Sequence, residues 1–257
     1  MSNSPDLLQS QRGRVLYLTI NRESRSNSIS PGVLSGISEA LTRVEGDSSI
    51  RAVVLTGAGT KSFCAGGDLR SGTTFVFDYA EPTMAFGNVL RQARRATVPL
   101  IARVNGACLA GGTGLLGMCD LAVAGESAVF GLPEVKVGVF PFQVISVMGH
   151  HEPRRVLAEM AITGEPLDAQ QALTYGLVNH VAADLDSKLD WPLSRILDKS
   201  PPAIRRGLYA MKAIETMAFE ESISFAESQI GLLALTEDSA EGQLAYREKR
   251  AAVWSGR

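Results

Sequence analysis

A helical segment lies between two β-rich runs near the N-terminus, and this order limits the fold more than any other feature. Residues 14–20 (RVLYLTI) and 51–56 (RAVVLT) have the composition of short strands. Between them, Ser30 can cap a helix that starts at Pro31, and apolar residues then recur at helical spacing. Because a connecting helix places two neighbouring strands in parallel, the pattern predicts an α/β fold with a parallel sheet.

Later segments extend this pattern. Further strands are expected at residues 98–104, 120–125 and 128–135, and the chain becomes mainly helical from about residue 153. Asp168, with Gln171 three residues later, predicts a capped helix that stops at Gly176. We therefore divide the chain into an α/β core over residues 1–199 and a C-terminal helical region over residues 200–257.

The composition excludes several classes of function. The chain has 257 residues, a formal net charge of −2 and no basic run, so nucleic-acid binding is not favoured. No apolar stretch is long enough to cross a bilayer and the first ten residues are polar, which predicts a cytoplasmic protein without a membrane partner. The spacing of Cys64, Cys108 and Cys119 fits no zinc or redox motif, so we expect reduced thiols and no metal site.

Two glycine-rich turns follow predicted strands. Four glycines surround the start of an apolar helical segment in residues 105–123, and FCAGGDL at residues 63–69 forms the other turn. Glycine in a helix costs roughly 0.5–1 kcal/mol relative to alanine, so close packing or a ligand must require the bare backbone. TGAGTKS at residues 56–62 lacks the third glycine of a dinucleotide fingerprint, and no glycine–lysine pair of a P-loop is present. Backbone N–H groups at such turns and at a helix N-terminus can instead form an oxyanion hole.

The chain resembles the enoyl-CoA hydratase/isomerase (crotonase) superfamily. The similarity runs from about residue 14 to the C-terminus and is carried by NRESRSNSIS, VVLTGAGTKSFCAGGDL, PLIARVNGACLAGGTGLLGMCDLAVAGESAVFGLPEVKVG, TGEPLDAQQALTYGLVNHV and EGQLAYREKR. It implies a crotonase-like spiral of ββα units with a helical C-terminal region. It also implies an acyl-CoA thioester as substrate, no cofactor apart from the coenzyme A of that substrate, and a homotrimer or hexamer.

The resemblance also implies catalytic residues. The amides of Gly67 and Gly111 match the two donors that grip the thioester carbonyl, and Glu134 matches a glutamate that moves protons. Hydratases of the family carry another glutamate on the glycine-rich helix, and Gly114 takes that position here. Burial among apolar neighbours would raise the pKa of Glu134 toward the range useful for proton transfer.

A single carboxylate favours a shift of a double bond over addition of water, because one base can remove a proton at one carbon and return it at another. Hydration remains open if another group holds the water; the candidates are Thr113, His150, His151 and Glu81. A catalytically silent acyl-CoA-binding scaffold is a further alternative, and other acyl-CoA reactions also stay open.

The remaining substrate contacts follow from the resemblance. Arg25 and Lys249 match basic positions near the CoA phosphates, with Lys249 reaching the CoA of a neighbouring subunit. The turn from Ala65 to Asp68 would border the adenine, and Phe140 would reshape the acyl pocket beside Gly114.

Overall fold

Two β-sheets form the centre of the protein. The computed structural model describes residues 5–68, 79–80, 83–149 and 153–257. The larger sheet has the strand order β1-β2-β3-β5-β7-β10, and the smaller has the order β4-β6-β8-β9. The strands of the larger sheet are β1 (Leu7–Arg12), β2 (Val15–Ile20), β3 (Ala52–Gly57), β5 (Leu100–Val104), β7 (Leu121–Gly125) and β10 (His180–Ala182). Those of the smaller sheet are β4 (Ser62–Cys64), β6 (Ala107–Leu109), β8 (Val129–Gly131) and β9 (Leu167–Asp168).

The larger sheet is parallel from β2 to β10, and both of its faces are covered. Every residue of β3 is buried, as expected for a strand between two layers. Successive side chains of a strand point to opposite faces, so Val53 and Leu55 join the main core while Val54 packs on the other side against α7 (Leu185–Leu197). The parallel pairing of β2 with β3 confirms the crossover predicted from the sequence.

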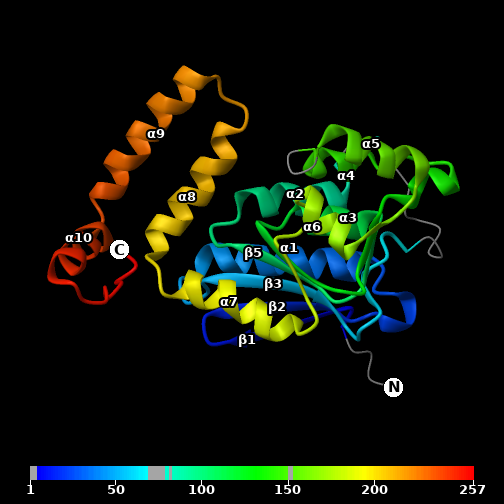
Figure 1. Cartoon of the computed structure of the whole chain (residues 1–257), viewed down its shortest axis with the longest axis horizontal. Coiled ribbons are helices and arrows are strands. Elements are labelled where there is room, and N and C mark those ends of the chain that lie inside the picture. The colour runs from blue at the N-terminus through cyan, green and yellow to red at the C-terminus, as the bar shows by residue number, and fades with distance from the viewer. Residues whose placement is uncertain (1–4, 69–78, 81–82, 150–152) are drawn as a thin grey trace.

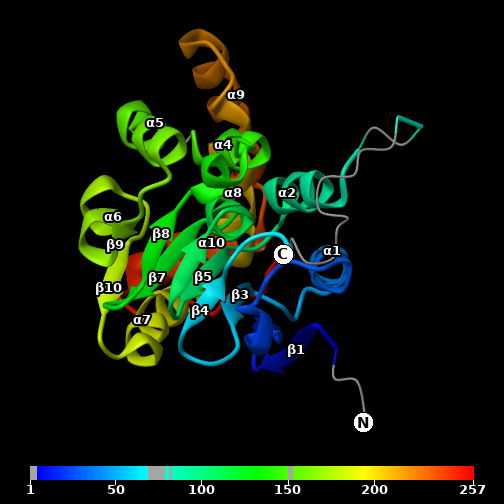
Figure 2. The same ribbon diagram turned by 90° about the vertical axis from the view of Figure 1, so that its right-hand side faces the viewer.

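The helix of that crossover is α1 (Pro31–Gly46). Ser30 caps it by accepting a hydrogen bond from the Val33 N–H, and Pro31 takes its first position. Figure 2 shows α1 and α2 together on one side of the sheets. The other helices of the core are α2 (Ala85–Arg95), α3 (Gly111–Gly117), α4 (Phe142–Met148), α5 (Arg154–Thr163) and α6 (Ala169–Tyr175), with 3₁₀ turns at Glu23–Arg25 and Pro133–Val137. The capping box of Asp168 and Gln171 and the left-handed Gly176 at the end of α6 are present as predicted.

Three helices project from the core as an arm. They are α8 (Pro201–Ile214), α9 (Phe219–Ala234) and α10 (Glu237–Glu248). Figure 1 shows α8 and α9 as a hairpin beside the core, with α10 and the C-terminus near the base of α8. Neither α8 nor α9 contains a buried residue, and Phe219, Ile230 and Leu235 are 73%, 70% and 83% exposed. The division at residue 199 stays a prediction, although the arm begins close to it. Among the helices that the structure describes, we find none with the length and apolar character of a membrane span.

One expectation about strands was wrong, and one strand was not predicted. The strand predicted over residues 128–135 ends at Gly131, because Pro133 fixes the backbone and begins a 3₁₀ turn. β1 was not predicted, since only its first residue, Leu7, is buried and its sequence LLQSQR is mostly polar.

Candidate active site

Three parallel strands of the smaller sheet end side by side, and each end carries one of the predicted catalytic residues. β6 pairs in parallel with both β4 and β8. β4 leads into the turn that contains Gly67, β6 leads into Gly111, and β8 leads into Glu134. Because the carboxyl ends of parallel strands meet at one edge of a sheet, these three residues follow strands that end at the same edge of the smaller sheet.

The turn of Gly67 is attached to the segment that precedes α1. The Ile29 N–H donates to the Gly66 carbonyl at 2.7 Å, and the Asp68 N–H donates to the Ile29 carbonyl at 3.1 Å. These two bonds form a parallel bridge between Ile29 and Gly67. In such a bridge the N–H of the residue between the two bonded positions points to the opposite side. The Gly67 N–H is therefore directed away from Ile29.

The second turn holds Gly111 at the start of α3. Ala110 precedes the helix with φ 51° and ψ −126°, a region that residues with a side chain rarely adopt. Its N–H donates to the Gly131 carbonyl at 2.9 Å, which fixes the turn to the end of β8. Among the described residues, neither the Gly111 N–H nor the Gly67 N–H has a hydrogen-bond acceptor. Both donors are thus available to a ligand.

The two turns touch, and this contact explains their glycines. A Cβ on Gly66, which has φ +90°, would lie 2.6 Å from the Ala110 Cβ. A Cβ on Gly111 would lie 3.8 Å from the Gly67 nitrogen, so the two amides border one small space. A Cβ on Gly112 would lie 2.1 Å from the carbonyl oxygen of Cys64. Gly66 and Gly112 are needed for packing, whereas Gly111 leaves open the space between the amides.

Glu134 combines partial burial with a missing hydrogen bond. It lies in the 3₁₀ turn that follows β8, and its Oε2 is buried without a hydrogen-bond partner among the described residues. Burial raises the pKa of this carboxyl above the ordinary value, while a backbone hydrogen bond opposes the shift. A half-buried carboxylate with a free oxygen is suited to accept and return a proton.

The wall next to Gly111 is apolar. Gly114 lies one turn further along α3, on the same face as Gly111. A Cβ on Gly114 would lie 2.8 Å from Cζ of Phe86 and 3.2 Å from Cγ2 of Val144. Carbon atoms from α2 and α4 therefore fill the space into which a side chain at position 114 would point. Phe140, partly buried, packs against the main core, and its ring centroid lies 5.4 Å from that of Phe142.

Of the four candidates for holding water, only Thr113 lies within the described residues, and its contacts do not support that role. The hydroxyl of Thr113 is fully buried and lies 3.0 Å from the carbonyl oxygens of both Cys108 and Gly131. Its one proton serves these two strand ends, so Thr113 joins β6 to β8 rather than facing a substrate. Glu81, His150 and His151 lie outside the described residues.

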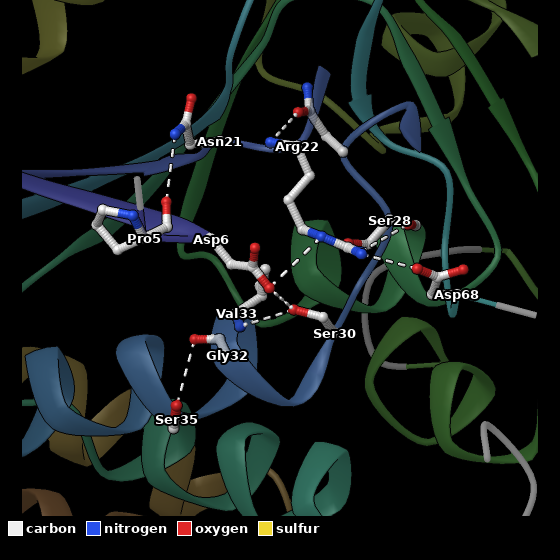
Figure 3. Close-up of polar contacts among 11 residues, drawn as sticks. Pro5, Asp6, Asn21, Arg22, Ser28, Ser30, Gly32, Val33, Ser35 and Asp68 are labelled. Atoms are coloured by element: carbon white, nitrogen blue, oxygen red, sulfur yellow. Dashed lines mark hydrogen bonds and ion pairs between the residues drawn. The ribbon is translucent and has the colours of Figure 1, made fainter. Parts of the chain in front are cut away.

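Sequence reasoning missed Arg22, which is the centre of a polar cluster beside the Gly67 turn (Figure 3). Its Nη2 lies 2.7 Å from Oδ2 of Asp68, and its Nη1 donates to the carbonyl and hydroxyl oxygens of Ser28 at 2.7 and 2.9 Å. Its Nε lies 3.5 Å from Oδ2 of Asp6, which also accepts a hydrogen bond from the Ser30 hydroxyl. Arg22 belongs to the segment NRESRSNSIS, but no spacing in the sequence pairs it with Asp68.

The two predicted basic residues lie in different places. Arg25 is exposed at the end of a 3₁₀ turn, and the next residue, Ser26, accepts a hydrogen bond from the Ala65 N–H at 3.1 Å. Arg25 is therefore close to the turn of Gly67. Lys249 is exposed at the end of α10, which Figure 1 places on the arm and away from α3. Within one chain, Lys249 does not join the other predicted residues.

Comparison with known proteins gives a consistent result. The model of the family "Enoyl-CoA hydratase/isomerase" matches residues 10–257. The enoyl-CoA hydratase EchA19 of Mycobacterium tuberculosis is 34% identical, over 100% of this chain and 99% of the relative. The (E)-benzylidenesuccinyl-CoA hydratase of Thauera aromatica is 33% identical, over 94% of this chain and 96% of the relative.

Solved structures confirm the predicted fold. The crystal structure of an enoyl-CoA hydratase from Mycobacterium smegmatis superposes with a TM-score of 0.90 at 33% identity and covers 98% of this chain and 99% of its own. The spiral α/β fold with a helical C-terminal region is therefore that of the crotonases. The chain belongs to the enoyl-CoA hydratase/isomerase family, and it is an enzyme that acts on acyl-CoA thioesters.

Proposed function

We propose that this enzyme moves the double bond of an enoyl-CoA from the Δ3 to the Δ2 position. The observation that carries the proposal is the apolar wall at Gly114. Phe86 and Val144 occupy the space that a second carboxylate would need, so Glu134 has no acidic partner on α3. Hydration calls for one group that positions water and another that transfers the proton, whereas isomerisation needs only one base.

The steps follow from the positions of three groups. The N–H groups of Gly67 and Gly111 donate to the thioester carbonyl oxygen, and the ionised Glu134 removes a proton from C2 of the 3-enoyl group. The electron pair of the broken C–H bond passes into a dienolate, whose negative oxygen the two amides stabilise. The protonated Glu134 then returns the proton to C4. The product is the 2-enoyl thioester, and no cofactor beyond the coenzyme A of the substrate takes part.

A hydratase is the second candidate. The relatives reported above are named hydratases, and this supports addition of water to a 2-enoyl-CoA. In that case a group other than Thr113 must hold the water, because its hydroxyl is already shared between two carbonyl oxygens. A catalytically silent acyl-CoA binder is the third candidate.

We also propose that the enzyme works as a homotrimer or a pair of trimers. The support is the arm, on which α8 and α9 leave large apolar side chains exposed. Exposed apolar area of this kind is typical of an interface with another subunit. Lys249 lies on the same arm and would reach the CoA phosphates of a neighbouring subunit, while Arg25 would contact those of its own.

A paired assay tests the proposal. Wild type, Glu134→Gln and the control Glu126→Gln, which changes an exposed glutamate, are each supplied with a 3-enoyl-CoA and a 2-enoyl-CoA. We expect the wild type and the control to isomerise the 3-enoyl-CoA faster than they hydrate the 2-enoyl-CoA, and Glu134→Gln to lose isomerisation by roughly 10²–10⁴-fold. Faster hydration in the wild type would favour the hydratase, and CoA binding without turnover of either thioester would favour the silent binder.

A further inference from the structure

Arg22 joins the Gly67 turn to two other parts of the chain. Its guanidinium contacts Asp68 on that turn, Ser28 on the segment before α1, and Asp6 just before β1 (Figure 3). The side chains of Arg22 and Asp68 are only 15% and 13% exposed, so little water screens the pair. Such charge-assisted bonds are the strong ones, and they fix the geometry of the groups that they join.

Asp68 is the residue directly after Gly67, and its own N–H is bonded to Ile29. Both the backbone and the side chain at position 68 are therefore tied to the segment of residues 28 and 29. The peptide that carries the Gly67 N–H also carries the Gly66 carbonyl, so its rotation would break the bond from the Ile29 N–H, while the bonds of Asp68 hold the next peptide in place. The ion pair of Arg22 and Asp68 thus fixes the residue that follows Gly67, and in this way it supports the direction of the Gly67 N–H.

The pair also has an electrostatic consequence. A carboxylate next to Gly67 would oppose negative charge that develops on a thioester oxygen held by that residue. The guanidinium of Arg22 lies 2.7 Å from this carboxylate and neutralises its charge. We infer that Arg22 is a positioning residue for the reaction: through Asp68 it fixes the Gly67 amide and keeps the charge of Asp68 from weakening the oxyanion site. The inference rests on the proposed role of Gly67.

Four variants separate these effects. Arg22→Gln takes the guanidinium away from the charged Asp68, Asp68→Asn removes the charge but keeps an acceptor, and the double variant removes both charges. Asp6→Asn is the matched control, because Asp6 also contacts Arg22 but is not part of the Gly67 turn. Each purified variant is checked for a wild-type circular dichroism spectrum before it is assayed.

The first measurement is kcat and KM for the thioester that the wild type converts. We expect Arg22→Gln to lower kcat by roughly 10–100-fold while KM changes little, since displacement by about 1 Å can cost two orders of magnitude. Asp68→Asn should lower kcat by a smaller factor, and the double variant should have a higher kcat than Arg22→Gln. Asp6→Asn should keep the wild-type kcat. A merely structural role predicts that the double variant is at least as slow as Arg22→Gln, and that result would overturn the inference.

The second measurement does not depend on turnover. Butyryl-CoA labelled with ¹³C at its carbonyl has no double bond to move, and the infrared difference spectrum reports how strongly the bound carbonyl is polarised. We expect a lower stretching frequency in the wild type and in Asp6→Asn than in free thioester, and a smaller shift in Arg22→Gln. If Arg22→Gln fails to fold, Arg22→Lys, which keeps the charge but cannot hold all three partners, should show an intermediate shift.

The spectrum also separates the two claims. An unshifted carbonyl in the wild type would refute the oxyanion site and with it the proposed function. A shift in the wild type that is unchanged in Arg22→Gln, or in Arg22→Lys where that variant is used instead, would refute the role of Arg22 alone.

Discussion

Substitution of Gly111 by alanine should lower the activity of the site while it leaves the stability of the fold almost unchanged. The added methyl group would lie 3.0 Å from Cδ1 of Ile29 and 3.8 Å from the Gly67 nitrogen. The Ile29 contact is with the far end of a flexible side chain, which can move by a few tenths of an ångström. The methyl group then competes for space with an oxygen atom held by both amides.

The two expected effects differ greatly in size. Alanine in place of glycine at a helical position contributes about 0.5–1 kcal/mol to stability, which offsets the tight contact with Ile29. The melting temperature should therefore change by no more than about 4 °C. The backbone N–H of residue 111 remains, but the methyl group keeps the oxygen atom away from it; loss of one oxyanion contact costs about 2.7–4 kcal/mol in the barrier, so kcat should fall by roughly 10²–10³-fold.

Gly112→Ala provides the contrast, since its Cβ would lie 2.1 Å from the backbone oxygen of Cys64 and no side chain can yield there. We expect this variant to lose its cooperative melting transition, whereas Gly111→Ala keeps it. Thermal melting and steady-state kinetics on the same preparations measure both quantities. A Gly111→Ala enzyme with wild-type kcat would refute the assignment of this amide to the reacting oxygen.

The remaining predictions concern Glu134, the first turn and the arm. Because the base must be ionised and burial raises the pKa of Glu134, kcat/KM should rise with pH through an apparent pKa above that of an ordinary glutamate; a limb at the ordinary value would contradict this. A folded-state pKa above the unfolded value means that the stabilising contribution is present at low pH and is lost as the pH rises through the folded-state pKa. The melting temperature of Glu134→Gln, relative to that of the wild type, should therefore increase from acid to neutral pH. A difference in melting temperature that does not change with pH would contradict this prediction. Gly66→Ala, with φ +90° and a Cβ 2.6 Å from that of Ala110, should destabilise the fold by more than about 1 kcal/mol in urea unfolding, and an unchanged midpoint would refute the packing argument. Phe219→Glu and Leu235→Glu should reduce the assembled mass in light scattering, whereas a monomeric wild type would rule out the proposed trimer.

The long, strongly patterned elements could be predicted from the sequence. The cap at Ser30, Pro31 at the first helical position and the crossover between β2 and β3 all depend on local chemistry that short sequence windows contain. The strands β4 and β6 have three residues each and no alternating pattern, so the second sheet was not predicted. The two glycine-rich turns therefore follow strands β4 and β6 of the smaller sheet, not strands of the larger sheet.

The site was predictable only where backbone chemistry leaves a mark on the sequence. The two glycine-rich turns are visible in the sequence, whereas the roles of Gly67 and Gly111 within them follow from the resemblance to the family. Their association with Glu134 depends on the pairing of β6 with β4 and β8, which no local pattern encodes. Contacts between side chains that are distant in sequence, such as Arg22 with Asp68 and Phe86 with Gly114, appear only in the folded chain.

The most direct test of the central claim is a crystal structure with butyryl-CoA, which the enzyme cannot isomerise. The thioester oxygen should lie within about 3.2 Å of the nitrogen atoms of both Gly67 and Gly111, with the carboxylate of Glu134 facing C2 of the acyl chain. A thioester oxygen that reaches neither nitrogen, or a Glu134 side chain turned away from C2, would contradict the account.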